Sequence, residues 1–585
     1  MKAVWRYQER GTSLAVLEFE NQQPLARRGY RRKTASPATA LVLLIALILS
    51  IPVLVVLGYV FAPTGDIWSH LASTVLPTYL YNTLVLAIGV SALVLVIGVG
   101  TAWLVTMCEF PGRRIFSWAL FLPLAMPAYI IAYTYTGMLD FAGPLQTALR
   151  EIFGWSRADY WFPSIRSLGG AVMMLGLVLY PYVYLVSRTA FLEQSICALE
   201  VGRTLGRGPW RGFLSIALPL ARPAIVTGLA LALMETLSDF GTVEYFAVDT
   251  FTTGIYRTWF GLNEPAAAAQ LAAVLMIFVF SLILLERVNR GKRRFHHTTG
   301  RYQNITRYRL GRNRQILAML ACGLPIFLGF LLPTAWLVKD SFLHSSSAFN
   351  AHFPSLVMNS VMVALIAAGL SLVVALFLIY GMRRDARAPS RMEQGALRVA
   401  SMGYAVPGPV LAVGIMLPFG FIDNTVDHWM RATFNISTGL ILSGTMVALL
   451  FAYIVRFLAI SLNTVEAGVD TVTPNMDRAA RTLGVTGFRK LVRVHIPIIS
   501  GSLMTAVLLV FVDVMKELPA TLVLRPFGFD TLAIRAYEMA SDERLADAAG
   551  PSLAIVLVGI LPVIVLSRAI ARSRPGQNIA ARNDY

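Results

Sequence analysis

The sequence predicts an all-α polytopic membrane protein in which about twelve transmembrane helices form two parallel, pseudo-twofold-related halves of six. Three observations carry this prediction. Of the 585 residues, 56% are hydrophobic and only 14% are charged, whereas soluble domains contain about 25% charged residues. Many apolar runs are long enough to cross a bilayer as helices, which takes about 20 residues, and none alternates as barrel strands do. The chain also repeats itself, as shown below.

The predicted spans are separated by polar segments. They cover residues 38–61, 79–107, 115–137, 167–187, 216–240 and 266–285 in the first half (38–286), and residues 315–338, 356–380, 397–420, 438–457, 497–519 and 549–567 in the second half (315–568). The remaining segments are an N-terminal tail (1–37), a basic linker (287–314) and a C-terminal tail (569–585). The polar tail precedes the first apolar run, so no cleavable signal peptide is expected.

The distribution of Lys and Arg predicts the orientation. If the N-terminus is cytoplasmic, the cytoplasmic segments hold 39 of the 50 Lys and Arg residues, counting Arg398 and Arg456 at the edges of two spans, and the external segments hold 9. Arg222 and Lys516 are placed within spans. Such a bias follows the positive-inside rule, so both termini are expected in the cytoplasm and the chain in a bacterial inner membrane. The net charge of +18 then reflects topology and lipid contact and not a nucleic-acid partner.

An internal repeat relates the two halves. A shift of 278 residues places Arg203-Thr204-Leu205-Gly206 on Arg481-Thr482-Leu483-Gly484. The same shift pairs Pro219 with Pro497, Glu235 with Asp513, Asp239 with Glu517, Phe251 with Phe529, Thr253 with Thr531 and Arg257 with Arg535. Shifts of 277 and 280 pair Asn82 with Asn359 and Pro127 with Pro407. Parallel repeats in a transporter place the substrate pathway at the interface between them.

The repeat centres on a loop between the fourth and fifth spans of each half, at residues 197–219 and 475–497. Each loop is predicted to form a short amphipathic helix that ends at a glycine, Gly206 or Gly484, because glycine readily adopts the left-handed conformation. A proline, Pro219 or Pro497, is then expected to open the next membrane helix. Such a knob can fit a groove on a soluble partner. The alternative is a basic loop lying on the lipid surface.

The wording of these loops resembles the EAA signature (EAA-x3-G-x9-I-x-LP) of ABC-importer permeases. The first loop reads Glu200-Val201-Gly202-Arg203-Thr204-Leu205-Gly206 and, after nine residues, Ile216-Ala217-Leu218-Pro219. The second reads Arg478-Ala479-Ala480-Arg481-Thr482-Leu483-Gly484, with Arg478 where the family has Glu. The resemblance covers nearly the whole chain. It implies that both loops are coupling helices for two copies of a cytoplasmic ATPase and that a periplasmic binding protein delivers the substrate.

The same resemblance bears on chemistry and cargo. The sequence contains no GxxxxGK(S/T) phosphate-binding loop, so ATP and Mg²⁺ are expected on the partner ATPase, and the chain is expected to be a transport subunit without catalytic residues or a cofactor of its own. Residues 234–246 and 516–521 are similar to permeases of ferric-iron importers, which makes Fe³⁺ the expected substrate. Permeases for thiamine, phosphonates and polyamines are similar here and remain alternatives.

Two other classes compete with this interpretation. A proton-coupled secondary transporter also has twelve spans in two halves, but it needs no paired cytoplasmic loops. A membrane enzyme needs clustered catalytic or metal-binding residues. The cysteines are far apart (Cys108, Cys197 and Cys322) and the external histidines are scattered, so no resident metal site is expected.

Acidic residues within the fifth and eleventh spans form a second repeated feature. Glu235 and Asp239 are four residues apart, as are Asp513 and Glu517, so each pair shares one helical face. A charge near the bilayer centre costs about 2.5–3.5 kcal/mol on insertion scales, which favours a protein interior or a watery cavity. We predict a cation-accepting vestibule or gate, with Lys516 as a counter-ion. Alternatively, these acids cap helix ends or pair with Lys516 and Arg525.

Overall fold

The computed structural model describes residues 37–63, 66–193, 209–290, 307–345, 349, 351–383 and 390–572. Within these ranges the regular secondary structure is helical apart from one pair of two-residue strands. Eleven helices are long and apolar enough to cross a membrane, and a bent pair, Arg113–Ala125 and Ala128–Phe153, brings the number to twelve if it counts as one span. The class of fold predicted from the sequence is therefore confirmed.

The helices of the two halves follow each other in the same order. The first half contains α1 (Pro37–Gly58), α2 (Asp66–Thr74), α3 (Leu76–Met107), α4 (Arg113–Ala119), α5 (Ala128–Leu139), α6 (Pro144–Phe153), α7 (Leu168–Glu193), α9 (Pro209–Gly212), α10 (Leu218–Ser238), α11 (Gly241–Tyr245), α12 (Phe251–Tyr256) and α13 (Pro265–Arg290). The second half contains α14 (Arg312–Ile326), α15 (Leu332–Leu343), α17 (Phe353–Arg383), α18 (Arg391–Ser401), α19 (Gly408–Phe434), α20 (Met446–Val469), α21 (Pro474–Thr482), α22 (Gly487–Lys490), α23 (Ile496–Met515), α24 (Pro519–Leu524), α25 (Leu532–Ser541) and α26 (Leu545–Arg572).

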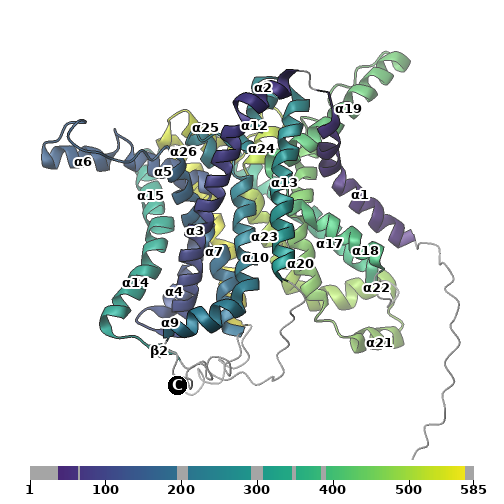
Figure 1. Ribbon diagram of the computed structural model, residues 1–585. Coiled ribbons are helices and arrows are strands. Elements are labelled where there is room, and N and C mark those ends of the chain that lie inside the picture. The colour runs from purple at the N-terminus through teal and green to yellow at the C-terminus, as the bar shows by residue number, and fades with distance from the viewer. Residues whose placement is uncertain are drawn as a thin grey trace, which may run out of the picture.

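The first membrane-spanning segment of each half packs against the other half. Helix α1 packs against α17, α18 and α19, while α14 and α15 pack against α3, α4 and α5 (Figure 1). Strand β2 (Tyr308–Arg309), just before α14, pairs in parallel with β1 (Cys108–Glu109), just after α3. The two halves are therefore interlocked and form one packed unit.

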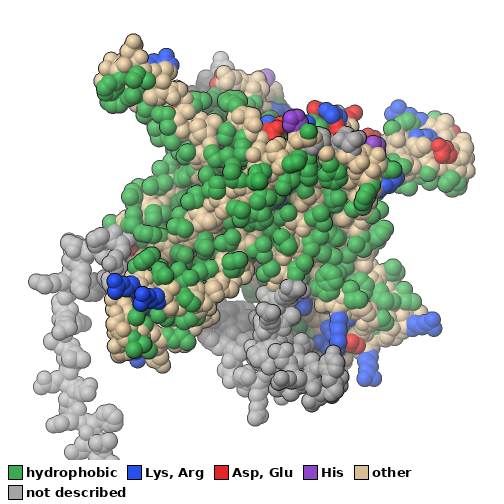
Figure 2. All heavy atoms as spheres, turned by 180° about the vertical axis from the view of Figure 1, so that it is seen from behind, with side chains coloured by type: hydrophobic (Ala, Val, Ile, Leu, Met, Phe, Trp, Pro, Cys, Tyr) green, Lys and Arg blue, Asp and Glu red, His purple; other side chains and the backbone are tan. Residues whose placement is uncertain are grey.

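We refer to the two ends of the molecule by Figure 1. The lower end carries α9, α21 and β2, and the upper end carries α2, α6 and α25. Hydrophobic side chains cover the middle of the molecule, and charged side chains gather near the two ends (Figure 2). A surface of this kind fits a bilayer, because hydrocarbon solvates apolar side chains and leaves charged ones in contact with water.

The third and ninth predicted spans are broken and not continuous. The first half has its break at Met126-Pro127, between the 3-10 turn η2 (Leu122–Ala125) and α5, and the helices on either side are bent by 90°. The second half has the matching break at Val406-Pro407, between η6 (Met402–Ala405) and α19. Proline removes a helical hydrogen bond and forces the preceding residue into an extended conformation, so the matched prolines explain both breaks.

Three other predicted spans have wrong boundaries. The helices that contain spans five and eleven begin at Trp210 and Gly487, so Pro219 and Pro497 lie inside them and do not open them. Each proline follows a π-helical turn, η3 (Phe213–Ala217) or η7 (Leu491–His495). A π-turn is a usual site for a local disruption of the helical hydrogen-bond ladder. The tenth span is Met446–Val469 and not 438–457.

Close packing of α3 against α7 depends on a glycine. A Cβ atom at Gly98 would lie 2.8 Å from Val183 Cβ and 3.0 Å from the carbonyl oxygen of Tyr180, whereas a Cβ at Gly100, on the same helix, would meet nothing within 4 Å.

We therefore expect Gly98→Leu to destabilise the protein by roughly 1–3 kcal/mol or more, the usual cost of overpacking. Gly100→Leu, the matched control, should be nearly neutral. Thermal unfolding of the purified variants in detergent measures both effects, and equal unfolding temperatures for the two variants would contradict this packing.

Candidate functional site

A cavity with charged side chains in its wall lies between the two halves. It has a volume of about 120 Å³ and is lined from the first half by the broken third span, α7 and α10, and from the second half by η6, α20 and α23. We name it the central cavity. All five residues that the sequence predicted for a pathway or gate contribute to its wall: Glu235, Asp239, Asp513, Lys516 and Glu517. Residues that are nearly 300 positions apart are thus brought to one site.

One acid of each half projects into the central cavity with a partner. The hydroxyl of Tyr404 donates a hydrogen bond of 2.9 Å to Glu235 Oε1 across the interface between the halves. Lys516 Nζ lies 2.8 Å from Asp513 Oδ1, and both side chains of this pair are about a quarter exposed. These two acids occupy equivalent positions in the repeat but have different partners.

The other acid of each half caps a short helix. Asp239 accepts hydrogen bonds of 3.2 Å from the backbone N–H groups of Thr242 and Val243 at the start of α11. Glu517 accepts hydrogen bonds of 2.9 Å from those of Ala520 and Thr521 at the start of α24. A carboxylate suits this place because the first N–H groups of a helix lack helical partners. The alternative reading of the sequence, helix capping, therefore describes these two residues.

Arg456 is a functional candidate that the sequence analysis missed. Its side chain is 8% exposed in the middle of α20 and lies 3.9 Å from Glu517 Oε1. It also donates a hydrogen bond of 3.0 Å to Ser238 Oγ of the other half. The predicted tenth span ended at residue 457, so Arg456 lay at its edge and was counted with the basic segment beyond it. The signal that could have identified it is the apolar run on both sides of this arginine, which continues as far as Leu462.

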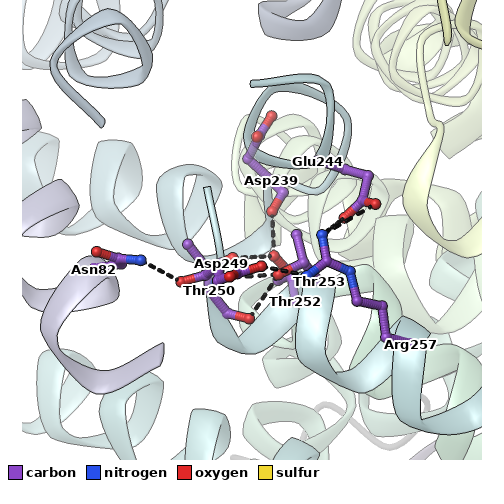
Figure 3. Close-up of polar contacts among 8 residues, drawn as sticks. All are labelled: Asn82, Asp239, Glu244, Asp249, Thr250, Thr252, Thr253 and Arg257. Carbon is purple, nitrogen blue, oxygen red and sulfur yellow. Dashed lines mark hydrogen bonds and ion pairs between the residues drawn. The ribbon is translucent and has the colours of Figure 1, made fainter. Parts of the chain in front are cut away.

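At the upper end, each half contains a second cluster of polar contacts. Asn82 donates a hydrogen bond of 2.8 Å to the backbone carbonyl of Asp249 (Figure 3), and Asn359 donates one of 3.1 Å to that of Asp530. The next residue in each half, Thr250 or Thr531, is the N-cap of α12 or α25.

This arrangement corrects the repeat beyond the fifth span. Thr531 corresponds to Thr250, at a shift of 281, and not to Thr253. The predicted matches of Phe251 with Phe529 and of Arg257 with Arg535 are wrong for the same reason. From α11 to α12 the helix starts are 10 residues apart (241 and 251), and from α24 to α25 they are 13 apart (519 and 532). Three additional residues in the second half displace the register.

The corrected register reveals a reversed ion pair. At a shift of 281, Arg257 matches Glu538, while Glu244 and Arg525 lie at the ends of the matching short helices α11 and α24. Arg257 pairs with Glu244 at 3.2 Å and also with Asp249 (Figure 3). Arg525 pairs with Glu538 at 2.6 Å and also with Asp530. Each half therefore holds one arginine between two acids. In the first half the arginine follows its glutamate in the sequence (Glu244 and Arg257), and in the second half it precedes it (Arg525 and Glu538). Arg525 is thus occupied here and not with the acids of the central cavity.

The second EAA-like loop (475–497) has the predicted short helix that ends at a glycine. Helix α21 ends before Gly484, which has a φ of +74° in the left-handed region, and it lies at the lower end (Figure 1). Arg478, Ala479, Arg481 and Leu483 are exposed, and Ala480 is buried. In the first loop, Glu200, Gly202, Arg203, Leu205 and Gly206 lie outside the described residues.

A chain of polar contacts ties α21 to the membrane helices. Asp477 on α21 lies 2.8 Å from His495 Nε2 and 2.9 Å from Lys490 Nζ. His495, which is 4% exposed, contacts the hydroxyl of Tyr380 on α17 through Nδ1 at 2.5 Å. Burial alone would raise the pKa of Asp477, but the hydrogen bonds from Lys490 and His495 lower it below its ordinary value. The sequence analysis did not identify these contacts.

The first half has an aromatic cluster at the corresponding place. The repeat puts Trp103 at the position of Tyr380 and Ala217 at the position of His495. The ring of Trp103 lies 5.6 Å from that of Phe191 and 4.9 Å from that of Phe213. The membrane helices at this place are therefore joined by aromatic packing in the first half and by polar contacts in the second.

The described residues contain no group of three or more His, Cys, Asp or Glu side chains placed to hold a metal ion. Cys108 and Cys322 are buried free thiols. In the described residues, the polar side chains thus connect the two halves and hold helices in place.

Comparison with known proteins identifies the family. Residues 95–294 and 378–577 match the family described as binding-protein-dependent transport system inner membrane component. The chain is 26% identical over 501 residues to the Fe(3+)-transport system permease protein FbpB 2 of Haemophilus influenzae, covering 84% of this chain and 89% of that protein. It is 23% identical over 470 residues to the ferric transport system permease protein FbpB of Actinobacillus pleuropneumoniae, covering 75% and 64%. Over 190 residues, 32% of this chain and 80% of the other protein, it is 29% identical to the molybdenum transport system permease protein ModB of Escherichia coli.

Two interlocked halves around a cavity with charged side chains in its wall, with a helix–glycine loop at one end, define a duplicated membrane transport protein. The two matches cover most of the chain, one in each half. The chain belongs to the family of binding-protein-dependent transport system inner membrane components and is the inner-membrane permease of an ABC importer. Permeases of this kind work with an ATPase and a binding protein.

The buried pair of Arg456 and Glu517 provides a test of the central cavity. Removing one partner of a buried ion pair costs roughly 3–5 kcal/mol, because the other charge remains buried. We expect Arg456→Met to lower the thermal unfolding temperature in detergent strongly, and Arg456→Met with Glu517→Gln to recover part of the loss. Lys516→Met, in a more exposed pair, is the matched control and should have a smaller effect. A double variant no more stable than Arg456→Met alone would show that the two side chains are not coupled.

Proposed function

We propose that this permease forms the translocation pathway for ferric iron, which a periplasmic binding protein delivers and two copies of a cytoplasmic ATPase drive inward. The observation that carries the proposal is the charge of the central cavity. Its wall contains four carboxylates against two basic side chains, Arg456 and Lys516. Relatives that cover most of the chain are named for Fe(3+) or ferric transport.

The pairing within the cavity favours a cation over an oxyanion. Lys516 is paired with Asp513, and Arg456 lies beside Glu517, so neither base is free for an anion. Glu235 and Asp239 form no ion pair with a base among the described residues, and the field they produce attracts cations. Molybdate and sulfate, which the names of one-half relatives suggest, and phosphonate fit this charge poorly. Thiamine and polyamines are cations, and experiment separates them from Fe³⁺.

The orientation follows from the same proposal. The lower end, with α21, faces the cytoplasm, and both termini lie on that side because of the bias in Lys and Arg. Leu483, which is 80% exposed, and its basic neighbours on α21 contact one ATPase copy. Glu200, Gly202, Arg203, Leu205 and Gly206 of the first loop contact the other copy. At the upper end, residues 143–164 and 521–547 receive the binding protein.

The cargo is tested with the complete system. We expect a binding protein from the same operon, loaded with Fe³⁺, to stimulate ATP hydrolysis by the reconstituted complex, whereas molybdate, sulfate, thiamine and putrescine should not. Glu235→Gln should lower Fe³⁺ transport about tenfold, the effect of ~1.4 kcal/mol. Glu466→Gln, an exposed acid outside the cavity, is the control. Stimulation by thiamine without iron would overturn the cargo and leave the importer class intact.

The coupling loops are tested by blocking them. Gly484 has a left-handed conformation with open space around it, so Gly484→Trp strains the turn and fills the surface that the ATPase would contact. We expect it to abolish co-purification with the ATPase and transport while the chain remains in the membrane, and Gly206→Trp to act alike on the first loop. Gly501→Trp, also in open space but on α23, is the control. Undiminished association in both loop variants would remove the coupling role.

A further inference from the structure

A second and larger cavity lies at the lower end of the second half. Its volume is about 820 Å³, and we name it the lower cavity. Its wall is built by α1, α17, the end of α20, α21 and the helix that runs from α22 into α23. It shares no lining residue with the central cavity.

The wall of the lower cavity is amphipathic. One side consists of apolar residues on membrane-spanning helices, including Leu41, Val373 and Phe377. Val373 and Phe377 are 59% and 52% exposed, so this side is open to the hydrocarbon around the protein. The opposite side carries Arg481 and Lys490 from the coupling loop.

The charges of the polar side leave one cation available. Among the described residues of the wall, Asp477 is the one acid, and it is paired with Lys490 and contacts His495. Arg481 is exposed and lies in the same wall. Its planar guanidinium suits two oxygens of one phosphate group.

The cavity is not a requirement of the fold. The first half fills the corresponding space with the rings of Trp103, Phe191 and Phe213. The repeat puts Tyr380, Val469 and Leu491 at these positions in the second half, and all three line the lower cavity. The smaller side chains of the second half therefore leave a cavity at the place that aromatic rings fill in the first half.

We propose that the lower cavity binds an anionic phospholipid, with the phosphate at Arg481 and an acyl chain along Leu41, Val373 and Phe377. Basic pockets between membrane helices at the basic side of a membrane protein are suited to anionic headgroups. A volume of about 820 Å³ takes a headgroup with the upper part of its chains, whereas a soluble anion would leave the apolar side empty. The lipid then joins α17 to α21 in the second half, as the aromatic cluster joins α3 to α7 in the first.

The experiment uses the purified full-length chain without its ATPase. The chain is equilibrated in nanodiscs with equal amounts of phosphatidylglycerol and phosphatidylcholine and transferred to detergent, and the lipid retained per chain is measured by mass spectrometry. We expect about one tightly held phosphatidylglycerol in preference to phosphatidylcholine. Arg481→Gln should lower its retention several-fold and abolish the preference. Val469→Phe with Leu491→Phe, which copies the first half, should remove the retained lipid.

Two matched controls separate this site from the lipid around the protein. Arg489→Gln removes a base of the same loop outside the cavity wall, and Ile498→Phe adds a ring on α23 outside it; both should retain the lipid. Should the double Phe variant fail to fold, Arg481→Gln against Arg489→Gln decides the question. Unchanged retention in Arg481→Gln, equal loss in the controls, or stabilisation of the chain by inorganic phosphate as strong as by phosphatidylglycerol would each overturn the proposal.

Discussion

The need to pair charges away from water is the constraint on which this structure depends. Arg456 lies inside a membrane-spanning helix, where hydrocarbon offers it no partner and an unpaired charge is costly. It therefore has to face Glu517 of its own half and Ser238 of the other. The hydrogen bond from Tyr404 to Glu235 crosses the same interface. The helices that carry charge are thus turned toward one another, and their other faces stay apolar toward lipid.

Duplication provides a second copy of each element, but the copies have diverged in a way that preserves local pairing. Where one half places Glu244 opposite Arg257, the other places Arg525 opposite Glu538, and the arginine keeps an aspartate in both. A reversal of both partners conserves the attraction, whereas a change of one would leave like charges facing each other. The two halves therefore keep the same kind of ion pair with its partners exchanged.

Much of this arrangement could be predicted from the sequence, because the apolar runs and the repeat at a shift of 278 residues can both be seen directly in the order of the residues. Asp239 and Glu517 could be matched since no insertion separates them from the coupling loops. Thr250 and Thr531 could not be matched, because three additional residues between short helices do not change the hydropathy pattern. The π-turns before Pro219 and Pro497 were missed because proline is common in the first turn of a helix, so each proline indicated a helix start. Only the structure shows that the helix begins earlier and continues through a π-turn to the proline.

The proposed coupling gains a physical route from the contacts of His495. This residue lies in a continuous helix that runs from Gly487 to Met515, and Asp513 of the central cavity lies 18 residues further along it. At about 1.5 Å per residue, these two side chains are separated by about 27 Å along a stiff helix. A displacement of α21 that acts through Asp477 on His495 would move the whole helix, and with it the Asp513–Lys516 pair. At the corresponding place in the first half, Ala217 stands where the second half has His495, and Trp103 contacts Phe191 and Phe213, so among the described residues this polar route belongs to the second half.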